Sequence, residues 1–289
     1  MRFAKLHGSG NDFIVIDARE TQRDWPRLAE AICDRHFGAG ADGLLLVRPS
    51  SAAGLRMGLY NADGSEAETS GNGLRCFVKY AVDRGLIRPR DGAVTIETAA
   101  GVPLAQVTLA GGRVQSVRIG MGRPRFAPQE VPVAVEAQPP ITDLSLEVDG
   151  RTLHVACVSM GNPHAVQFVS EPVSGYPLEQ VGPLVERHQL FPNRVNFEVA
   201  RVLDRGHVEA RTWERGVGET LACGTGACAV MVAARLTGQV GERVEVRELG
   251  GPLTLEWDGE GEVYLTGPAV EVFEGEWRDE NQEPRARNR

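Results

Sequence analysis

The sequence predicts an α+β fold with two pseudo-symmetric domains, each a curved, mostly antiparallel sheet wrapped around a central helix. Three observations lead to this fold class. The two halves of the 289-residue chain resemble one another, each half contains one apolar helical segment, and most remaining segments are short strands between Gly, Pro and Asn turns. Internal similarity of this kind is typical of a fold built from two copies of one unit.

The repeat is clearest in two glycine-rich segments. Residues 69–78 resemble residues 222–231, which places Ser70 opposite Cys223. Further matches keep the same order: the Gly-Asn pairs at 10–11 and 161–162, and the strand–turn–strand segments at 94–104 and 244–253. Because all of these matches keep their order, we interpret the chain as a duplicated domain.

Each glycine-rich segment predicts a helix behind it. Apolar residues recur at i, i+3, i+4 and i+7, namely Leu74, Phe77, Val78 and Ala81 in the first half and Ala227, Val230, Met231 and Ala234 in the second. Gly85 and Gly238 stand where a C-terminal glycine cap is expected. The second helix is apolar on nearly every side, so we expect it to be buried.

Short runs with strand character occupy much of the remaining chain. They lie at 13–17, 43–47, 113–120, 195–202, 262–265 and 270–273. We expect an N-terminal domain at 1–122, joined by the last strand at about 268–277, and a C-terminal domain at 123–267. The charged segment 278–289 is expected to be a disordered tail.

The composition excludes several classes of protein. A net charge of −8 disfavours a nucleic-acid partner, which needs a basic surface. No apolar stretch approaches the roughly 18 residues of a membrane helix, and the N-terminus lacks the apolar core of a signal peptide. The five cysteines form no CxxC pair, so we expect free thiols and a cytoplasmic protein. No motif for a metal or ATP is present.

Ser70 and Cys223 each stand immediately before a predicted helix. The first turn of a helix has free N–H groups and partial positive charge, which stabilise a carboxylate and lower the pKa of a thiol. Two such helix starts facing each other across a domain cleft would hold an amino acid's α-carboxylate, with an acid/base group on each face of its α-carbon. This arrangement suits epimerisation. With only Lys5 and Lys79 in the chain, a pyridoxal Schiff base is disfavoured.

Several short motifs along the chain occur together in one known family. They are KLHGSGNDF at 5–13, NADGSE at 61–66, GNGLRC at 71–76, SMGNPH at 159–164, RVN at 194–196, WERG at 213–216 and ETLACGTG at 219–226. Through these motifs the chain resembles the diaminopimelate epimerase family over residues 1–277. The resemblance implies a fold similar to that of proline racemase, a homodimer, and no metal or cofactor. It also implies conversion of LL-2,6-diaminopimelate to the meso form in lysine biosynthesis.

The resemblance assigns a role to each matching residue. Cys223 and Ser70 occupy the two acid/base positions, Glu214 lies near the reacting centre, and His164 supports the thiol. The substrate-binding positions, which would hydrogen-bond the carboxylates and amino groups of the ligand, are Asn11, Asn61, Gly71, Asn72, Asn162, Asn196, Glu214, Arg215, Gly224 and Thr225. Without the resemblance, each asparagine is also compatible with a turn, and Glu214 and Arg215 with a surface ion pair.

Ser70 departs from the family pattern, which has a second cysteine at this position. A serine hydroxyl is a much weaker acid than a thiol and a poor base unless another group activates it. Three interpretations stay open: a natural variant with slow or partial turnover, an engineered substitution, or one-base chemistry such as α,β-elimination. The alternative functions are therefore another amino-acid racemase, a one-base lyase, or an amino-acid-binding protein in which Ser70 is only a helix cap.

Overall fold

The computed structural model describes residues 1–67 and 70–278, which divide into two compact units. Unit 1 comprises residues 1–119 together with the C-terminal segment that begins at Gly267, and unit 2 comprises residues 120–266. Residues 68–69, which include Thr69 of the repeat, and 279–289, which form most of the predicted tail, lie outside the described residues. Each unit contains one of the two predicted helices.

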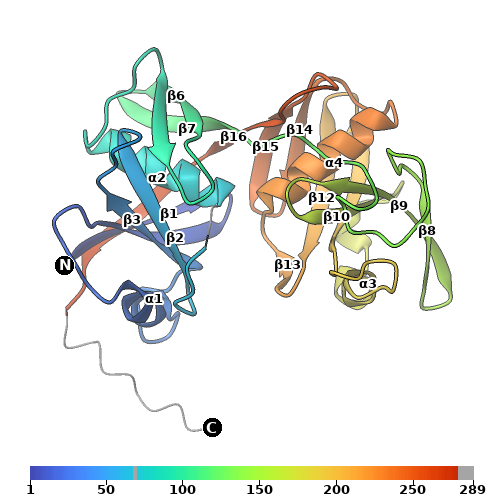
Figure 1. Cartoon of the computed structure of the whole chain (residues 1–289), viewed down its shortest axis with the longest axis horizontal. Helices are drawn as coiled ribbons and strands as arrows, with labels where there is room; N and C mark the ends of the chain where they lie inside the picture. The colour runs from blue at the N-terminus through green and yellow to red at the C-terminus, as the bar shows by residue number, and fades with distance from the viewer. Residues whose placement is uncertain (68–69, 279–289) are drawn as a thin grey trace, which may run out of the picture. The chain divides into compact units, whose positions relative to one another are not determined.

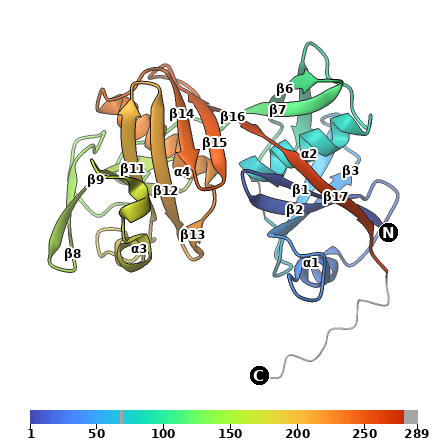
Figure 2. The ribbon, with the colours of Figure 1, turned by 180° about the vertical axis from the view of Figure 1, so that it is seen from behind.

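Unit 1 is a sheet that runs in the order β17-β1-β2-β3-β4-β5-β6-β7, with two helices packed on it. Its elements are β1 (Arg2–Gly8), β2 (Asn11–Asp17), α1 (Trp25–Cys33), β3 (Gly43–Arg48), β4 (Leu55–Asn61), α2 (Gly71–Asp83), β5 (Ala93–Glu97), β6 (Leu104–Ala110), β7 (Arg113–Gly120) and β17 (Val270–Glu276). The pairs β2–β3 and β4–β5 are parallel and the others antiparallel. Figure 2 shows β17, from the end of the chain, beside β1.

Unit 2 repeats this sheet strand by strand. Its elements are β8 (Leu144–Val148), β9 (Arg151–Ser159), β10 (Pro163–Phe168), η1 (Val173–Gly175), α3 (Leu178–Glu186), β11 (Asn196–Asp204), β12 (His207–Glu214), β13 (Gly218–Thr220), α4 (Gly224–Leu236), β14 (Arg243–Glu248), β15 (Gly251–Glu256) and β16 (Tyr264–Pro268). The order is β8-β9-β10-β11-β12-β14-β15-β16. The pairs β10–β11 and β12–β14 are parallel and the others antiparallel, in the same places along the order as the parallel pairs of unit 1. The predicted fold class is therefore confirmed.

Helices α2 and α4 form because each sequence carries an N-cap residue, apolar residues at helical spacing and a glycine after the last turn. Ser70 and Cys223 have extended backbone angles and accept a hydrogen bond from the third residue of the helix, so each is an N-cap. Gly85 and Gly238 follow the last turns with φ of 68° and 73°, the left-handed conformation that glycine adopts without strain. The predicted helices and their glycine caps are confirmed.

Each of these helices is central to its own sheet (Figure 1). Helix α2 contacts β1, β2, β3, β4 and β17, and α4 contacts β9, β10, β11, β12, β14 and β15. Every residue of α4 from 226 to 234 is buried, which confirms the expectation from its all-round apolar surface. The start of each helix is thereby held in a fixed place relative to the strand ends around it.

Our expectation of a single helix in each half was incomplete. Helix α1 begins at the N-cap Asp24, with Pro26 in its first turn, and α3 packs in the same place in unit 2. Both are only nine residues long, and the internal Pro183 weakens the helical signal of α3. Both nevertheless have buried apolar residues at i, i+3 and i+7, which was the available signal.

The extra helices cover the second face of part of each sheet. In unit 1, Ile14 and Ile16 of β2 pack with α1 in one apolar cluster, while the alternate residue Val15 is also buried. In unit 2, Phe197 and Val199 of β11 pack with α3 in the same way. Strands buried on both faces read as continuous apolar runs rather than as alternation, which explains the uniform burial of β2 and β3.

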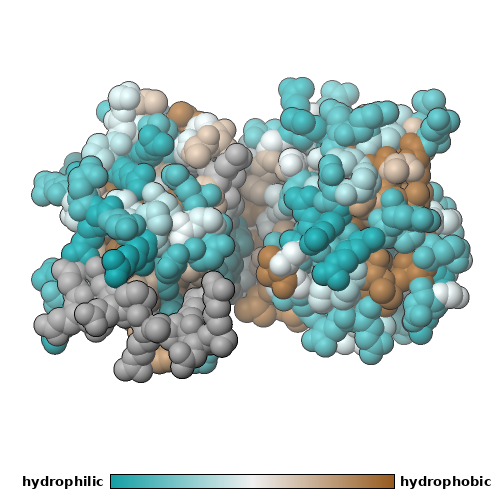
Figure 3. Space-filling model, turned by 60° about the horizontal axis from the view of Figure 1, so that its bottom comes forward, coloured by the Kyte–Doolittle hydropathy of each residue, from teal (hydrophilic) through white to brown (hydrophobic). Residues whose placement is uncertain are grey.

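The surface agrees with the acidic, polar composition. Within residues 1–67 and 70–278, no helix combines the length and apolarity needed to cross a bilayer. In the view of Figure 3, both units present mostly hydrophilic surface, and unit 2 also shows apolar areas. Among the exposed apolar side chains of unit 2 are Val217, Leu221 and Leu249, with 72%, 53% and 59% of their surface accessible. Val217 and Leu221 precede Cys223 in sequence, and Leu249 directly follows β14.

We predict that Gly238→Ala lowers the free energy of unfolding by about 1 kcal/mol, because alanine is strained at positive φ. A Cβ at Gly238 would meet no atom within 4 Å, so the loss comes from backbone strain and not from a clash. Gly175→Ala is the matched control: its Cβ also enters open space, without a positive φ. Urea denaturation of both variants measures the difference, and equal stabilities would contradict the glycine-cap assignment.

Candidate active site

Cys223 is the N-cap residue of α4, and its thiol closes the first turn. The Gly226 N–H donates to Cys223 Sγ at 3.4 Å, and the Thr225 hydroxyl lies 3.4 Å from the same sulfur. A Cβ at Gly226 would lie 2.9 Å from Glu198 Oε1, so a larger residue here would require the buried Glu198 carboxyl group to move. Gly224 and Thr225, the first two residues of the helix, are half-buried, and N–H groups in the first turn of a helix have no acceptor within that helix.

A buried carboxyl group holds the backbone of Cys223. The Cys223 N–H is 3.2 Å from both carboxyl oxygens of Glu248, the last residue of β14. The Thr212 hydroxyl, from β12, donates to Glu248 Oε1 at 3.1 Å. The end of one strand is thereby connected to the start of α4 by hydrogen bonds rather than by apolar packing alone.

A second chain of polar contacts starts at His164 on β10. His164 Nδ1 lies 2.7 Å from Glu198 Oε1, and both side chains are fully buried. His164 Nε2 lies 3.0 Å from Asn162 Oδ1, and Asn162 Nδ2 donates to the Thr225 hydroxyl at 3.2 Å. Since Thr225 also contacts Cys223 Sγ, the predicted residues His164 and Asn162 are connected to the thiol.

The remaining predicted residues of unit 2 lie on β11 and at the end of β12. Glu214 Oε1 accepts from the Thr220 hydroxyl at 2.6 Å. Asn196 is buried, donates to the Pro163 carbonyl at 3.0 Å and accepts from the Arg215 N–H at 2.8 Å. The Arg215 side chain is exposed and donates to a backbone carbonyl, that of Asn193, at 2.8 Å.

The electrostatics around Cys223 differ from our expectation. Burial raises the pKa of the Cys223 thiol well above its ordinary value, and the charges of Glu214, Glu248 and Glu198 raise it further. Burial also raises the pKa of Glu248 to about 8, and the pKa of Glu214 is raised for the same reason. The prediction that the helix start lowers the thiol pKa is therefore wrong, because it considered the helix alone and neither the burial of the thiol nor the carboxyl groups facing it.

In unit 1, Ser70 occupies the position that Cys223 has in unit 2. Its hydroxyl accepts from the Gly73 N–H at 3.0 Å, and its φ and ψ of −147° and 125° are extended. Gly71 and Asn72 open α2, as Gly224 and Thr225 open α4. The structure thus places Ser70 as a helix cap, as Cys223 is, with a hydroxyl in place of the thiol.

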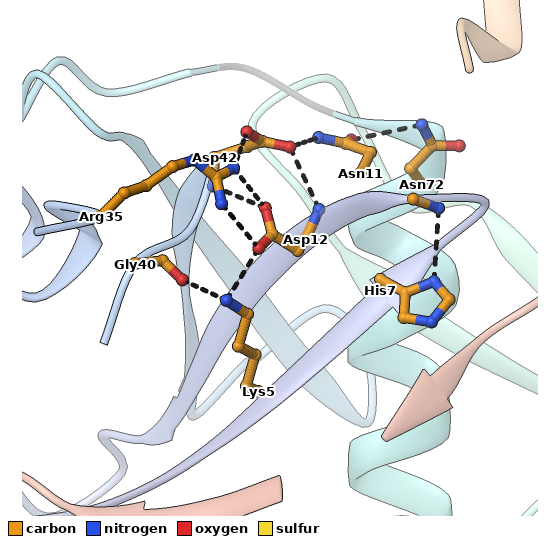
Figure 4. A network of polar contacts seen from close by, with 9 residues as sticks. Lys5, His7, Asn11, Asp12, Arg35, Gly40, Asp42 and Asn72 are labelled. Atoms are coloured by element: carbon orange, nitrogen blue, oxygen red, sulfur yellow. Dashed lines mark hydrogen bonds and ion pairs between the residues drawn. The ribbon is translucent and has the colours of Figure 1, made fainter. Parts of the chain in front are cut away.

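The unit 1 residues Asn11 and Asn72 contact each other beside a network of ion pairs (Figure 4). Asn72 Nδ2 donates to Asn11 Oδ1 at 3.2 Å, and Asn11 Nδ2 donates to Asp42 Oδ2 at 2.6 Å. Arg35 bridges Asp42 and Asp12, at 2.7 and 2.8 Å. Asn61, by contrast, donates to the Ser65 hydroxyl at 2.9 Å and is exposed.

The sheet topology explains why the predicted residues gather within each unit. Asn11 begins β2 and Asn61 ends β4, so both lie at the same edge of the sheet, since β4 is antiparallel to β3 and β3 is parallel to β2. Asn162, Asn196 and Glu214 take the corresponding positions around β10, β11 and β12. In each unit this edge lies beside the start of the central helix.

Sequence reasoning missed three residues of the Cys223 environment: Glu198, Glu248 and Thr212. All three are buried. A usable signal existed for Glu198, because a charged residue interrupts the apolar run of β11. Glu248 and Thr212 carried no such signal, since their contact depends on the pairing of β12 with β14. Among the residues that the structure describes, no group of His, Cys, Asp or Glu is arranged to hold a metal ion.

Comparisons with known proteins agree with this geometry. The family model described as "Diaminopimelate epimerase" matches residues 3–127 and 156–272. The chain is 49% identical over 280 residues to the diaminopimelate epimerase of Moorella thermoacetica, covering 96% of this chain and 99% of that protein. It is 47% identical over 278 residues to that of Acetivibrio thermocellus, covering 96% and 98%.

Solved structures share the fold at lower identity. A probable proline racemase from Agrobacterium radiobacter has a TM-score of 0.68 at 17% identity, with 98% of this chain and 94% of that chain covered. A hydroxyproline epimerase from Agrobacterium vitis has a TM-score of 0.68 at 19% identity, covering 95% and 91%. These two comparisons establish the similarity of fold.

We predict that Glu248 makes the folded protein less stable as pH rises. Its pKa of about 8 in the folded protein lies above its ordinary value of 4.5, so the unfolded chain releases the proton first. The stabilising contribution is complete below about pH 4.5 and is lost as pH rises to about 8, an effect of a few kcal/mol. Glu248→Gln should remove this loss, as measured by urea denaturation at several pH values.

The control for this measurement is Glu245→Gln, which removes a half-exposed carboxylate from the same strand. It should leave the pH dependence unchanged. If the stability of the Glu248→Gln variant falls with pH as steeply as that of the unaltered chain, the raised pKa of Glu248 is wrong.

Proposed function

The chain belongs to the diaminopimelate epimerase family and is therefore an epimerase, and from this premise we propose that Cys223 moves the proton at the α-carbon of diaminopimelate. The observation that carries the proposal is the position of Cys223, as the cap of α4, beside the first-turn N–H groups of Gly224 and Thr225, which have no acceptor within the helix. In our proposal the substrate is LL-2,6-diaminopimelate, the product is the meso form, and the reaction belongs to lysine biosynthesis.

The start of α4 suits the charge that develops in this reaction. Removal of an α-proton leaves negative charge that spreads onto the α-carboxylate, and preorganised N–H donors stabilise that charge. The free N–H groups of a helix start bind carboxylates. We assign this role to Gly224 and Thr225 in unit 2, and to Gly71 and Asn72 in unit 1.

The raised pKa of Cys223 fits proton transfer with a weakly acidic C–H group. A thiol with a raised pKa is predominantly protonated at neutral pH and can donate its proton to the α-carbon. Its thiolate, once formed, is a stronger base than that of an ordinary cysteine. Asn162 and His164 contact Cys223 through Thr225, and we propose that they hold the thiol in position.

Ser70 is proposed as the second proton carrier and as the weak one. It caps α2 as Cys223 caps α4, but a hydroxyl ionises far less readily than a thiol. Two-carrier epimerisation requires both positions to exchange protons, so Ser70 should limit the rate. The distal carboxylate and amino group are assigned to Arg215 and Glu214, and further hydrogen bonds to Asn11, Asn61, Asn162 and Asn196.

We further propose that the enzyme works without pyridoxal phosphate, as a homodimer in the cytoplasm. The absence of pyridoxal phosphate is supported by the ion pairs that both lysines form. Lys5 pairs with Asp12 at 2.9 Å and Lys79 with Asp83 at 2.8 Å. An ammonium group held in an ion pair is a poor nucleophile for Schiff-base formation.

We predict that incubation with diaminopimelate in D2O places deuterium at the α-carbon of both stereoisomers, as followed by NMR. Cys223→Ala should abolish this exchange. Deuterium in one stereoisomer only would favour one-base chemistry, and formation of a keto acid would favour a lyase. Tight binding with no exchange at all would favour an amino-acid-binding protein and would contradict the proposed activity.

We predict that Ser70→Cys raises the rate of epimerisation, by at least about tenfold, because the second carrier then has a thiol's acidity. The matched control is Ser145→Cys, which adds a thiol on an exposed position of β8. It should leave the rate unchanged. A Ser70→Cys variant no faster than the unaltered chain would mean that Ser70 does not limit proton transfer.

A further inference from the structure

Glu248 is a buried carboxyl group to which the proposed reaction gives no part, although it contacts Cys223 directly. We propose that Glu248 is a positioning residue that holds the Cys223 backbone at the start of α4 and, through its charge, sets the protonation state of the Cys223 thiol. This inference rests on the proposed function only in taking Cys223 as the acid/base group.

The contacts of Glu248 place its charge beside the start of the helix. Both of its carboxyl oxygens lie 3.2 Å from the Cys223 N atom. Immediately after Glu248, the Gly250 N–H donates to the Leu221 carbonyl at 2.6 Å, which fastens the turn after β14 to the segment before Cys223. The carboxyl group therefore has little freedom to move away from the thiol.

Cys223 is faced by charged or titratable groups from four strands. They are Glu198 on β11, Glu214 on β12 and Glu248 on β14, whose charges act on the thiol directly, and His164 on β10, which is connected to it through Asn162 and Thr225. Three of them are carboxyl groups and one is an imidazole, whose Nδ1 lies 2.7 Å from Glu198 Oε1. An anion close to a buried thiol opposes the loss of its proton, so the ionisation of Glu248 and that of Cys223 are coupled.

Glu248 differs from the other two carboxyl groups in what it bonds. Glu198 contacts His164, and Glu214 accepts from Thr220 and also hydrogen-bonds the side chain of Cys223. Glu248 instead accepts from the backbone of Cys223 and from Thr212. A purely structural acceptor at this place needs no charge, because an amide oxygen could accept the same bond. A carboxyl group adds a charge that an amide lacks, and this difference separates the two roles.

The test is a thiolate titration of the full chain, read from the ultraviolet absorbance of the thiolate. Each curve is corrected with the same protein carrying Cys223→Ser, so that only Cys223 contributes. Glu248→Gln keeps an acceptor oxygen for the Cys223 N–H and removes the charge. We expect its midpoint to fall by about one pH unit or more, which is roughly tenfold more thiolate at a given pH between about 8, above which Glu248 is ionised, and the midpoint.

Two further variants complete the design. Glu245→Gln removes a carboxylate from the same strand, where it pairs with Arg247 at 2.9 Å, and should not move the midpoint. Thr212→Val removes a hydrogen bond that favours ionised Glu248, and should move the midpoint in the same direction as Glu248→Gln, by less. The Thr212 variant also decides the question if Glu248→Gln does not fold.

A midpoint that is unchanged in both Glu248→Gln and Thr212→Val would overturn the proposal and leave Glu248 as a structural acceptor. The titration uses no substrate, so it gives the same answer whether or not the chain epimerises diaminopimelate. If the unaltered chain showed no α-proton exchange while Glu248→Gln still shifted the midpoint, the proposed function would be contradicted and the role of Glu248 would stand.

Discussion

The hydrogen bonds between the Cys223 N–H and the Glu248 carboxyl group, at 3.2 Å to each oxygen, join the start of α4 to the end of β14. This contact requires a carboxyl group to be buried, which is unfavourable unless the group is bonded or stays protonated. The raised pKa of Glu248 reflects that constraint. The high pKa of the Cys223 thiol follows from the same burial and from the neighbouring carboxyl groups.

The duplicated fold supplies the same scaffold twice and different chemistry each time. In both units, a central helix begins beside strand ends that carry polar residues, Asn11 and Asn61 in unit 1 and Asn196 and Glu214 in unit 2. In unit 2 the strand ends bring buried carboxyl groups and an imidazole to a thiol. In unit 1, α2 is capped by the hydroxyl of Ser70, and Asn72 next to it contacts Asn11. The scaffold therefore determines position, and the side chains determine acidity.

Much of this fold could be predicted from local signals, whereas the environment of the site could not. Helix α4 carries an N-cap at Cys223, an apolar face and a glycine after its last turn, all within one segment. Helix α3 contains Pro183 and has no side-chain cap, so its local signal is weak. Glu248 and Thr212 come together only through strand pairing, which no spacing along the chain reveals. The predicted direction of the thiol pKa was wrong because burial, the largest cause, and the facing carboxyl groups both raise that pKa.

The most direct measurement is a crystal structure of the chain with diaminopimelate bound. The account predicts that the substrate's α-carboxylate accepts hydrogen bonds from the N–H groups of Gly224 and Thr225, with Cys223 Sγ in contact with the α-carbon. A ligand bound away from the start of α4, or a Cys223 sulfur that stays covered by protein atoms in the complex, would contradict it.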